Sequence, residues 1–242
     1  MSETTSGAEA TATSRARSRR VPAVAVAAIV VAGTAIAVPA VVQSTQAAEL
    51  AHSREQFEDT KETLAAAAED YRAHRKVAVD VHVAVDEVLA VVTPAMIDSA
   101  GALTALVADG DELKKLLTAT TPKEAATTPT GKTAAANRAA SDAIDKAAAA
   151  LTDMAAALQN TTERTITDLR SLVDAAAKAG PSLSFPQAGA TEQIALAWAV
   201  TGLYATALNT VEDPSDIAAG GRDALVAYAS AVNDAVASQD PG

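Results

Sequence analysis

The residues of this chain that are best suited to hold metal ions are three histidines and 30 carboxylates, and cysteine is absent. Glu49 and His52 have the Glu-x-x-His spacing that di-iron helical bundles use. Such a site needs a second copy of the motif and further carboxylates that face inward, and this sequence contains one copy. The spacing therefore predicts no metal site.

Two histidines lie four residues from an aspartate, since His74 follows Asp70 and His82 precedes Asp86. In a helix this spacing places both members of a pair on one face. The two histidines are eight residues apart, which is not the spacing of a chelating pair. A solvated face or helix pairing explains both pairs, and a pH-sensing role is the alternative.

The stretch ATTPTGKT, residues 126–133, matches a relaxed phosphate-binding loop with alanine in place of the first glycine. A phosphate loop follows a strand, whereas a segment rich in proline and threonine precedes this one. We interpret it as a loop that leads into a helix. The sequence patterns of serine hydrolases, zinc proteases and calcium loops are absent. The sequence thus predicts no catalytic residue, cofactor or metal, and no enzyme.

Trp198 and Tyr204 lie in an uncharged stretch, residues 194–208. The stretch is short for a second membrane span, so we expect a central core helix that is apolar on all sides. In that interpretation the two aromatic residues are the large members of the core. In the alternative they line a ligand pocket.

The elements that position these residues are predicted to be helices. Alanine and valine dominate the 49% of hydrophobic residues, and alanine is the best helix former. The fold class is therefore all-α. Heavy use of Ala, Val, Thr, Asp and Arg is typical of a GC-rich bacterial coding sequence. The net charge of −11 would repel nucleic acid, so we expect no nucleic-acid partner.

A transmembrane helix or signal-anchor is expected over residues 21–43, because residues 21–42 carry no charge and form a helix of about 33 Å. Four arginines precede it, which predicts a disordered cytoplasmic tail over residues 1–20 and an extracytoplasmic body. The alternative is secretion after cleavage near Ala47. The predicted span includes Val21, Ile29, Ile36 and Val42. The arginines that predict its orientation are Arg15, Arg17, Arg19 and Arg20.

Residues 48–117 are predicted to form a first helical arm. Apolar residues recur every seven positions from Leu50 to Val92, which indicates a helix-pairing stripe. The alternating valines of residues 77–85 also suit a strand, but a helix is favoured because no turn flanks them. Within this arm we expect a new helix to start at Thr93. We expect this helix to end in a turn at Gly110.

Residues 118–132 are predicted to be a linker loop, because they combine prolines with many threonines. A second long arm follows over residues 133–179 with the same seven-residue period, and C-terminal helices are expected over residues 190–237. The predicted stripe consists of Leu50, Phe57, Leu64, Tyr71, Val85 and Val92 in the first arm and Ile144, Leu151, Leu158 and Leu172 in the second.

The sequence thus predicts a transmembrane helix followed by an alanine-rich hairpin of two antiparallel long helices, which the C-terminal helices cover as a bundle. The layout is similar to that of membrane-anchored, alanine-rich helical proteins of GC-rich Gram-positive bacteria, and this similarity implies no activity. We expect a single-pass membrane protein that acts as a structural or protein-interaction module at the cell envelope. Its partners would be membrane lipid through residues 21–42 and a protein, or a second copy through the stripe. The alternative function is an exported ligand-binding or sensor domain with a pocket near Trp198 and Tyr204, whose small-molecule ligand is unknown.

Overall fold

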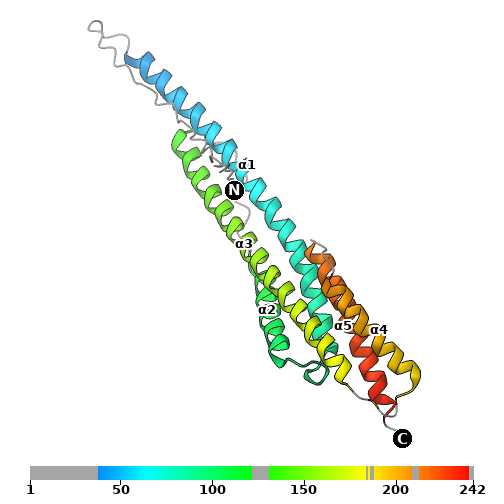
Figure 1. The fold of residues 1–242 in the computed structure, drawn as a ribbon. Coiled ribbons are helices and arrows are strands. Elements are labelled where there is room, and N and C mark those ends of the chain that lie inside the picture. Colours follow the sequence, from blue (N-terminus) through cyan, green and yellow to red (C-terminus); the bar gives the residue numbers. More distant parts are fainter. Residues whose placement is uncertain (1–37, 122–130, 184, 186–187, 209–212, 240–242) are drawn as a thin grey trace, which may run out of the picture. The chain divides into compact units, whose positions relative to one another are not determined.

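The computed structural model describes residues 38–121, 131–183, 185, 188–208 and 213–239. These residues form five α-helices and two 3-10 turns, and no strand occurs among them. The helices are α1 (Val38–Val91), α2 (Ala100–Thr118), α3 (Ala134–Ala179), α4 (Ala190–Leu208) and α5 (Pro214–Ala237) (Figure 1). The all-α class is therefore confirmed for the described part of the chain. The chain divides into two units, Met1–Gln43 and Ser44–Gly242, and the architecture below is that of the second.

The predicted membrane span and its four arginines lie outside the described residues, apart from the last few positions of the span. Those positions belong to the start of α1, which begins at Val38. None of the helices in the described part of the chain combines the length and the apolar character needed to cross a membrane.

The helix α1 is continuous because no glycine or proline interrupts residues 44–93. The valine-rich residues 77–85 are helical, as predicted. Val81, Val85 and Val88 are fully buried, and their spacing of four and three residues is that of one helix face. Burial of this face against neighbouring helices outweighs the small helix cost of the β-branched side chains.

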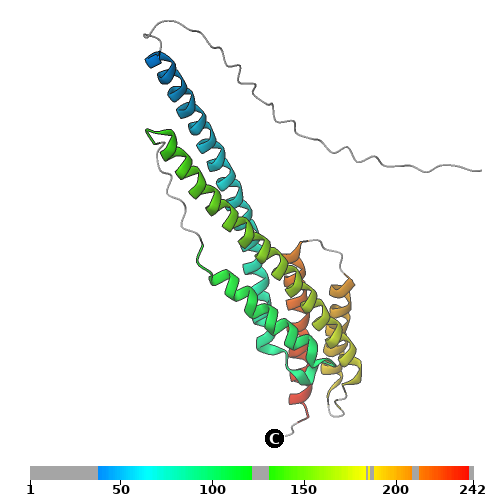
Figure 2. The same ribbon diagram turned by 90° about the vertical axis from the view of Figure 1, so that its left-hand side faces the viewer.

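The two long helices α1 and α3 run parallel, and this corrects the predicted antiparallel hairpin (Figures 1 and 2). Contacts near their N-terminal ends agree, because Asn137 bonds to Ser53 and Arg138 lies 4.0 Å from Glu49. The reversal of direction is made by α2, so the chain has already turned back before residues 119–133 lead into α3. A seven-residue pattern does not show whether two helices run parallel or antiparallel. The segment that joins α1 to α3, which contains α2, determines their relative direction.

The register of this parallel pair can be read from the Ser53–Asn137 contact, whose residues are 84 positions apart. That offset is twelve heptads of seven residues, so the stripe of α1 lies against the α3 column that contains Ser141 and Ala155, and the stripe of α3 lies against the α1 column that contains Ala67. Along the pair the offset aligns large with small side chains, for example Phe57 with Ser141, Tyr71 with Ala155 and Ala67 with Leu151. Complementary sizes in one layer favour pairing of α1 with α3 within the chain over pairing of two identical helices.

The helix α2 passes through Gly110 without a break, which corrects the turn predicted there. Gly110 is buried, and a Cβ atom added to it would lie 3.1 Å from Val85 Cγ1. The glycine therefore serves close packing of α2 on α1. The restart expected at Thr93 is a 3-10 turn (Pro94–Met96) with proline at its start, and α2 follows from Ala100.

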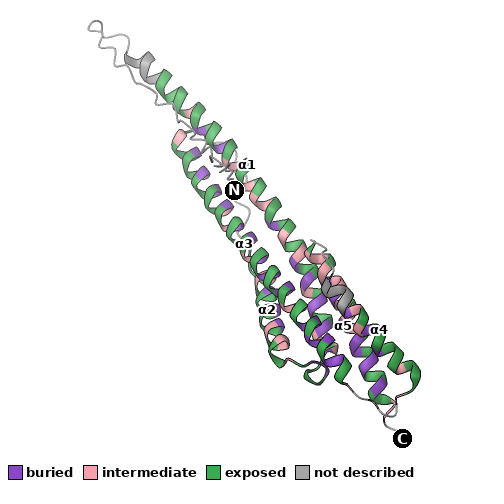
Figure 3. Cartoon of the chain, in the orientation of Figure 1, coloured by how far each residue is buried: buried purple, intermediate pink, exposed green. Residues whose placement is uncertain are grey.

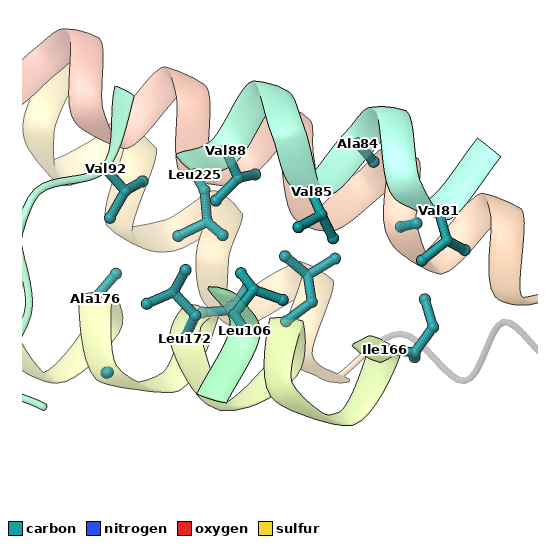
Figure 4. Close-up of a cluster of buried hydrophobic side chains, with 14 of the residues drawn as sticks. Val81, Ala84, Val85, Val88, Val92, Leu106, Ile166, Leu172, Ala176 and Leu225 are labelled. Atoms are coloured by element: carbon teal, nitrogen blue, oxygen red, sulfur yellow. The ribbon is translucent and has the colours of Figure 1, made fainter. Parts of the chain in front are cut away.

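The core lies where α2, α3 and α5 gather on the second half of α1, and α4 packs on α3 and α5. Figure 4 shows Val88 and Val92 of α1 pointing toward Leu172 and Ala176 of α3, with Leu225 of α5 beside them. The buried hydroxyl of Tyr228 donates a 2.7 Å hydrogen bond to the Met96 carbonyl and so joins α5 to the turn after α1. This gathering of helices determines which face of α4 meets solvent.

Candidate interaction surface on α4

The side chains of the predicted helix-pairing stripe are buried or half-buried between helices of the same chain. Phe57, Tyr71 and Val85 are buried on α1, and Leu50 and Leu64 are half-buried. The remaining members of the stripe, Val92, Ile144, Leu151, Leu158 and Leu172, are buried as well. Because α1 and α3 bury these residues against each other, the stripe is used for pairing within one chain.

The sequence motifs that suggested chemistry stay apart from one another. Glu49 and His52 are both exposed on α1, and no group of three metal-binding side chains occurs in the described part of the chain. Residues 126–130 of the phosphate-loop match lie outside the described residues. Its last residue, Thr133, caps α3 by accepting a hydrogen bond from the Ala136 amide, which is the role of a helix start.

The two histidine–aspartate pairs form on helix faces, as the spacing predicts. His74 Nε2 lies 3.4 Å from Asp70, and His82 Nε2 lies 3.5 Å from Asp86. The two histidines differ in burial, because the other ring nitrogen of His82, Nδ1, is buried and has no hydrogen-bond partner among the described residues.

A charged cluster joins α2 to α3, and the sequence patterns did not indicate it. The Arg164 guanidinium lies 2.7 Å from Glu112 and 3.2 Å from Asp109. Burial raises the pKa of Asp168 above its ordinary value of 3.8, and the neighbouring Asp109 carboxylate raises it further. The positive charge of Arg164 opposes that shift in the pKa of Asp168. Only the fold brings α2 beside this part of α3, so no sequence spacing could have shown the cluster.

Trp198 lies on the outer face of α4 with 73% of its surface exposed, which corrects the expectation of a central core helix. Ile194, one turn earlier on the same face, is 56% exposed. The side chain of Tyr204 lies outside the described residues. Leu196 and Leu203 are buried, so α4 packs on the bundle with its opposite face.

A groove of about 530 Å³ lies beside α4, between the helix and the turn after α3. Its lining includes Gly180, Leu183, Phe185, Leu196 and Val200, with Gln193 as a polar member. Trp198 does not line this groove. At 100° per residue, Ala197 stands between the face of Trp198 and the groove, and it belongs to the lining. The apolar surface of α4 therefore continues from Trp198 into the groove.

The helix α2 offers an internal comparison for α4. Both helices have 19 residues, and both follow a long helix and a 3-10 turn that contains proline. Five charged residues occur in α2, whereas Glu192 is the one charged residue of α4. Exposed faces of helices are normally charged or polar. The uncharged, exposed face of α4 is thus unusual within this fold, and Figure 3 shows its exposed residues in green.

The sequence indicates this surface as an uncharged stretch, but it does not show which face of the helix meets solvent. A helix that is apolar on all sides gives no periodicity that distinguishes its inner from its outer face. The spacing of Ile194 and Trp198 by four residues shows that they share a face, and the structure shows that this face is the outer one.

Comparison of the chain with protein-family models, with curated proteins and with solved structures gives no match.

Proposed function

We propose that this chain is a single-pass membrane protein whose extracytoplasmic helical body acts as a protein-interaction module at the cell envelope. One observation carries the proposal. The helix α1 begins at Val38, within the uncharged stretch of residues 21–42, and continues without a break to Val91. The helix that organises the bundle therefore includes residues 38–42, the last five residues of the stretch suited to a bilayer.

The described unit has a two-helix section and a bundle section. The start of α5 contacts α1 through Ser215, whose hydroxyl lies 3.4 Å from Asp80. Between Leu50 and Asp80, α1 rises about 45 Å, and α3, which begins at Ala134, is its partner over this distance. The interaction face on α4 therefore belongs to the end of α1 that is farther from Ser44. A paired stalk of this length suits a module that presents a surface to a partner.

The continuity of α1 also favours a retained anchor over a cleaved signal. Residues 44–50 are helical, and they include the small residues around Ala47 where cleavage was the alternative. Proteolytic cleavage occurs preferentially in irregular exposed segments rather than within a helix. We therefore propose that residues 21–42 remain attached and contact membrane lipid.

The competing proposal is an exported ligand-binding or sensor domain. The groove between α4 and the turn after α3 favours it, because its apolar lining with a single amide, Gln193, resembles that of sites for small apolar ligands. In this proposal Leu196 and Phe185 would contact the ligand, and Trp198 would stand outside it. A saturable shift of the thermal unfolding midpoint with a small apolar compound, lost in Leu196→Gln, would favour this candidate.

The test of the anchor is cell fractionation combined with the intact mass of the mature chain. We expect the chain in the membrane fraction, with a mass that includes residues 21–42. A mass that begins near Ala48 would mean secretion. A phosphatase fused after Gly242 should be active outside the cytoplasm, and replacement of Arg15, Arg17, Arg19 and Arg20 by glutamate should reduce this activity. Replacement of Arg54 and Arg75 on α1 is the matched control. Phosphatase activity confined to the cytosol would refute the proposed topology.

A further inference from the structure

The outer face of α4 has the chemistry of a docking site, because two large apolar side chains are exposed on it together. Ile194 and Trp198 are four residues apart, and Thr201 follows on the same face at 100° per residue. Tryptophan is among the residues that contribute most to binding at protein interfaces. A pair of such residues on an uncharged helix has the spacing with which one helix receives the apolar face of another.

The segment of chain that carries this face is acidic. In the described part of α4, α5 and their flanks there is one basic residue, Arg222, and it already pairs with Asp223 at 2.8 Å. The acidic residues of the same segment are Glu192, Asp213, Asp216, Asp223 and Asp234. The net charge of this segment is thus −4, in a chain whose net charge is −11, and a partner with basic residues would be attracted to it.

Charge disfavours two other occupants. A second copy of this face would bring two segments of net charge −4 together, and an anionic lipid surface would be repelled in the same way. The outer face of a 19-residue helix is about 28 Å long and about 10 Å wide, or about 280 Å². Stable interfaces bury about 800 Å² on each partner, so the contact is of the transient class.

We propose that the outer face of α4, centred on Ile194 and Trp198, docks an amphipathic helix of another protein with lysine or arginine beside its apolar face. The apolar face of that helix lies on Ile194 and Trp198, and one of its side chains enters the groove beside Ala197. Its basic residues are attracted by the net negative charge of the α4–α5 segment. This inference rests on the proposed function and names the partner chemistry of the interaction module.

The test uses Trp198 as its reporter, because it is the only tryptophan of the chain. Full-length protein in phosphatidylcholine nanodiscs is titrated with two synthetic 19-residue helical peptides that lack tryptophan. One carries leucine and lysine, and the other carries the same leucine face with glutamate in place of lysine. We expect the lysine peptide to shift the Trp198 emission to shorter wavelength with saturation, and more weakly as salt increases. The glutamate peptide should give no shift.

Ile194→Glu should weaken binding of the lysine peptide at least tenfold while Trp198 remains as the reporter. The matched control is Val107→Glu, which introduces the same charge on the exposed face of α2 and should leave binding unchanged. Equal binding of both peptides, no binding of either, or an equal loss in both variants would overturn the proposal. So would Trp198 emission that is already at short wavelength without peptide, since another part of the chain or a second copy would then cover the face. Should fractionation find the chain outside the membrane, the same titration in buffer without nanodiscs tests docking separately from anchoring.

Discussion

Asn137 donates a 3.1 Å hydrogen bond to the hydroxyl of Ser53 across the buried interface between α3 and α1. Its side-chain carbonyl accepts a 2.6 Å hydrogen bond from the Gly131 amide, so one residue joins three parts of the chain. Both Asn137 and Ser53 are buried, and the Ser53 hydroxyl also donates to the Leu50 carbonyl. A satisfied polar pair in an apolar seam penalises every register that separates its members.

Asn137→Ala should destabilise the fold by about 1–3 kcal/mol, because it removes the buried hydrogen bond to Ser53 and leaves the half-buried Gly131 amide without its acceptor. The measurement is the free energy of unfolding from urea titration. Asn160→Ala is the matched control, since Asn160 is exposed on the same helix and should change stability by less than about 0.5 kcal/mol. Equal effects of the two substitutions would show that the polar pair does not hold the register.

The parallel direction of α1 and α3 can be tested with disulfides, because the natural chain has no cysteine that interferes. Ala67→Cys combined with Leu151→Cys places the two thiols 84 residues apart, which is the observed register offset. We expect rapid and nearly complete cross-linking under mild oxidation, detected by non-reducing electrophoresis.

The contrasting pair is Ala78→Cys with Leu172→Cys, which an antiparallel hairpin about residues 118–132 would bring together. In the observed register these positions differ by ten residues along the helices, or about 15 Å, which is too far for a disulfide. Efficient cross-linking of this pair, with none between residues 67 and 151, would contradict the parallel arrangement.

The seven-residue columns and the helical class were predictable from the sequence because both depend on local spacing and on alanine content. The direction of the second arm was not predictable, because a heptad column reads the same in a parallel and in an antiparallel pair. The decisive feature is that α2 runs through Gly110 as one helix of 19 residues. A glycine in an apolar pattern indicates a helix end as readily as a close helix contact, and only the position of Val85 distinguishes the two.

The candidate site was predictable in part for a similar physical reason. The sequence predicts Trp198 in a buried core helix or beside a pocket, but its exposure depends on which side of α4 meets α3 and α5. An uncharged helix offers no polar face that would predict its orientation. The cluster of Arg164 with Asp109 and Glu112 joins helices about 50 residues apart in sequence, so no local pattern contains it.

Close packing at Gly110 predicts that a larger side chain there destabilises the protein. Gly110→Leu should lower the free energy of unfolding by about 1–3 kcal/mol or more, because its side chain would collide with Val85, although leucine favours helix. At Gly202 a new Cβ atom would meet no other atom within 4 Å. Gly202→Ala should therefore raise stability by about 0.5–1 kcal/mol. Urea unfolding of both variants measures the contrast, and a stable Gly110→Leu variant would refute the close contact.

The raised pKa of Asp168 predicts a local pH effect on stability. Because the folded pKa lies above 3.8, the native state binds the proton more tightly than the unfolded chain does. The contribution of Asp168 to stability therefore falls as the pH rises from about 4 through the folded pKa. Asp168→Asn should raise stability at pH 7 by a few tenths of a kcal/mol, about the size of a solvent-screened surface interaction. Urea titrations at pH 4 and pH 7 measure it, with exposed Asp153→Asn as control, and a lower stability of Asp168→Asn at pH 7 would contradict the prediction.

Tyr228 provides the sharpest pH test of the bundle, because burial raises its pKa to about 12 while its hydroxyl donates to the Met96 carbonyl. An unfolded tyrosine ionises near pH 10, so the folded state holds this proton more tightly and loses stability as the pH rises from about 10 to about 12. Tyr228→Phe should cost about 1–2 kcal/mol at pH 7, since it leaves the Met96 carbonyl without its donor. In this variant the alkaline loss of stability should shrink. Ultraviolet absorbance of tyrosinate and urea unfolding at each pH measure both effects. Ionisation of all three tyrosines near pH 10 in the folded protein would show that α5 does not bury Tyr228 against the turn after α1.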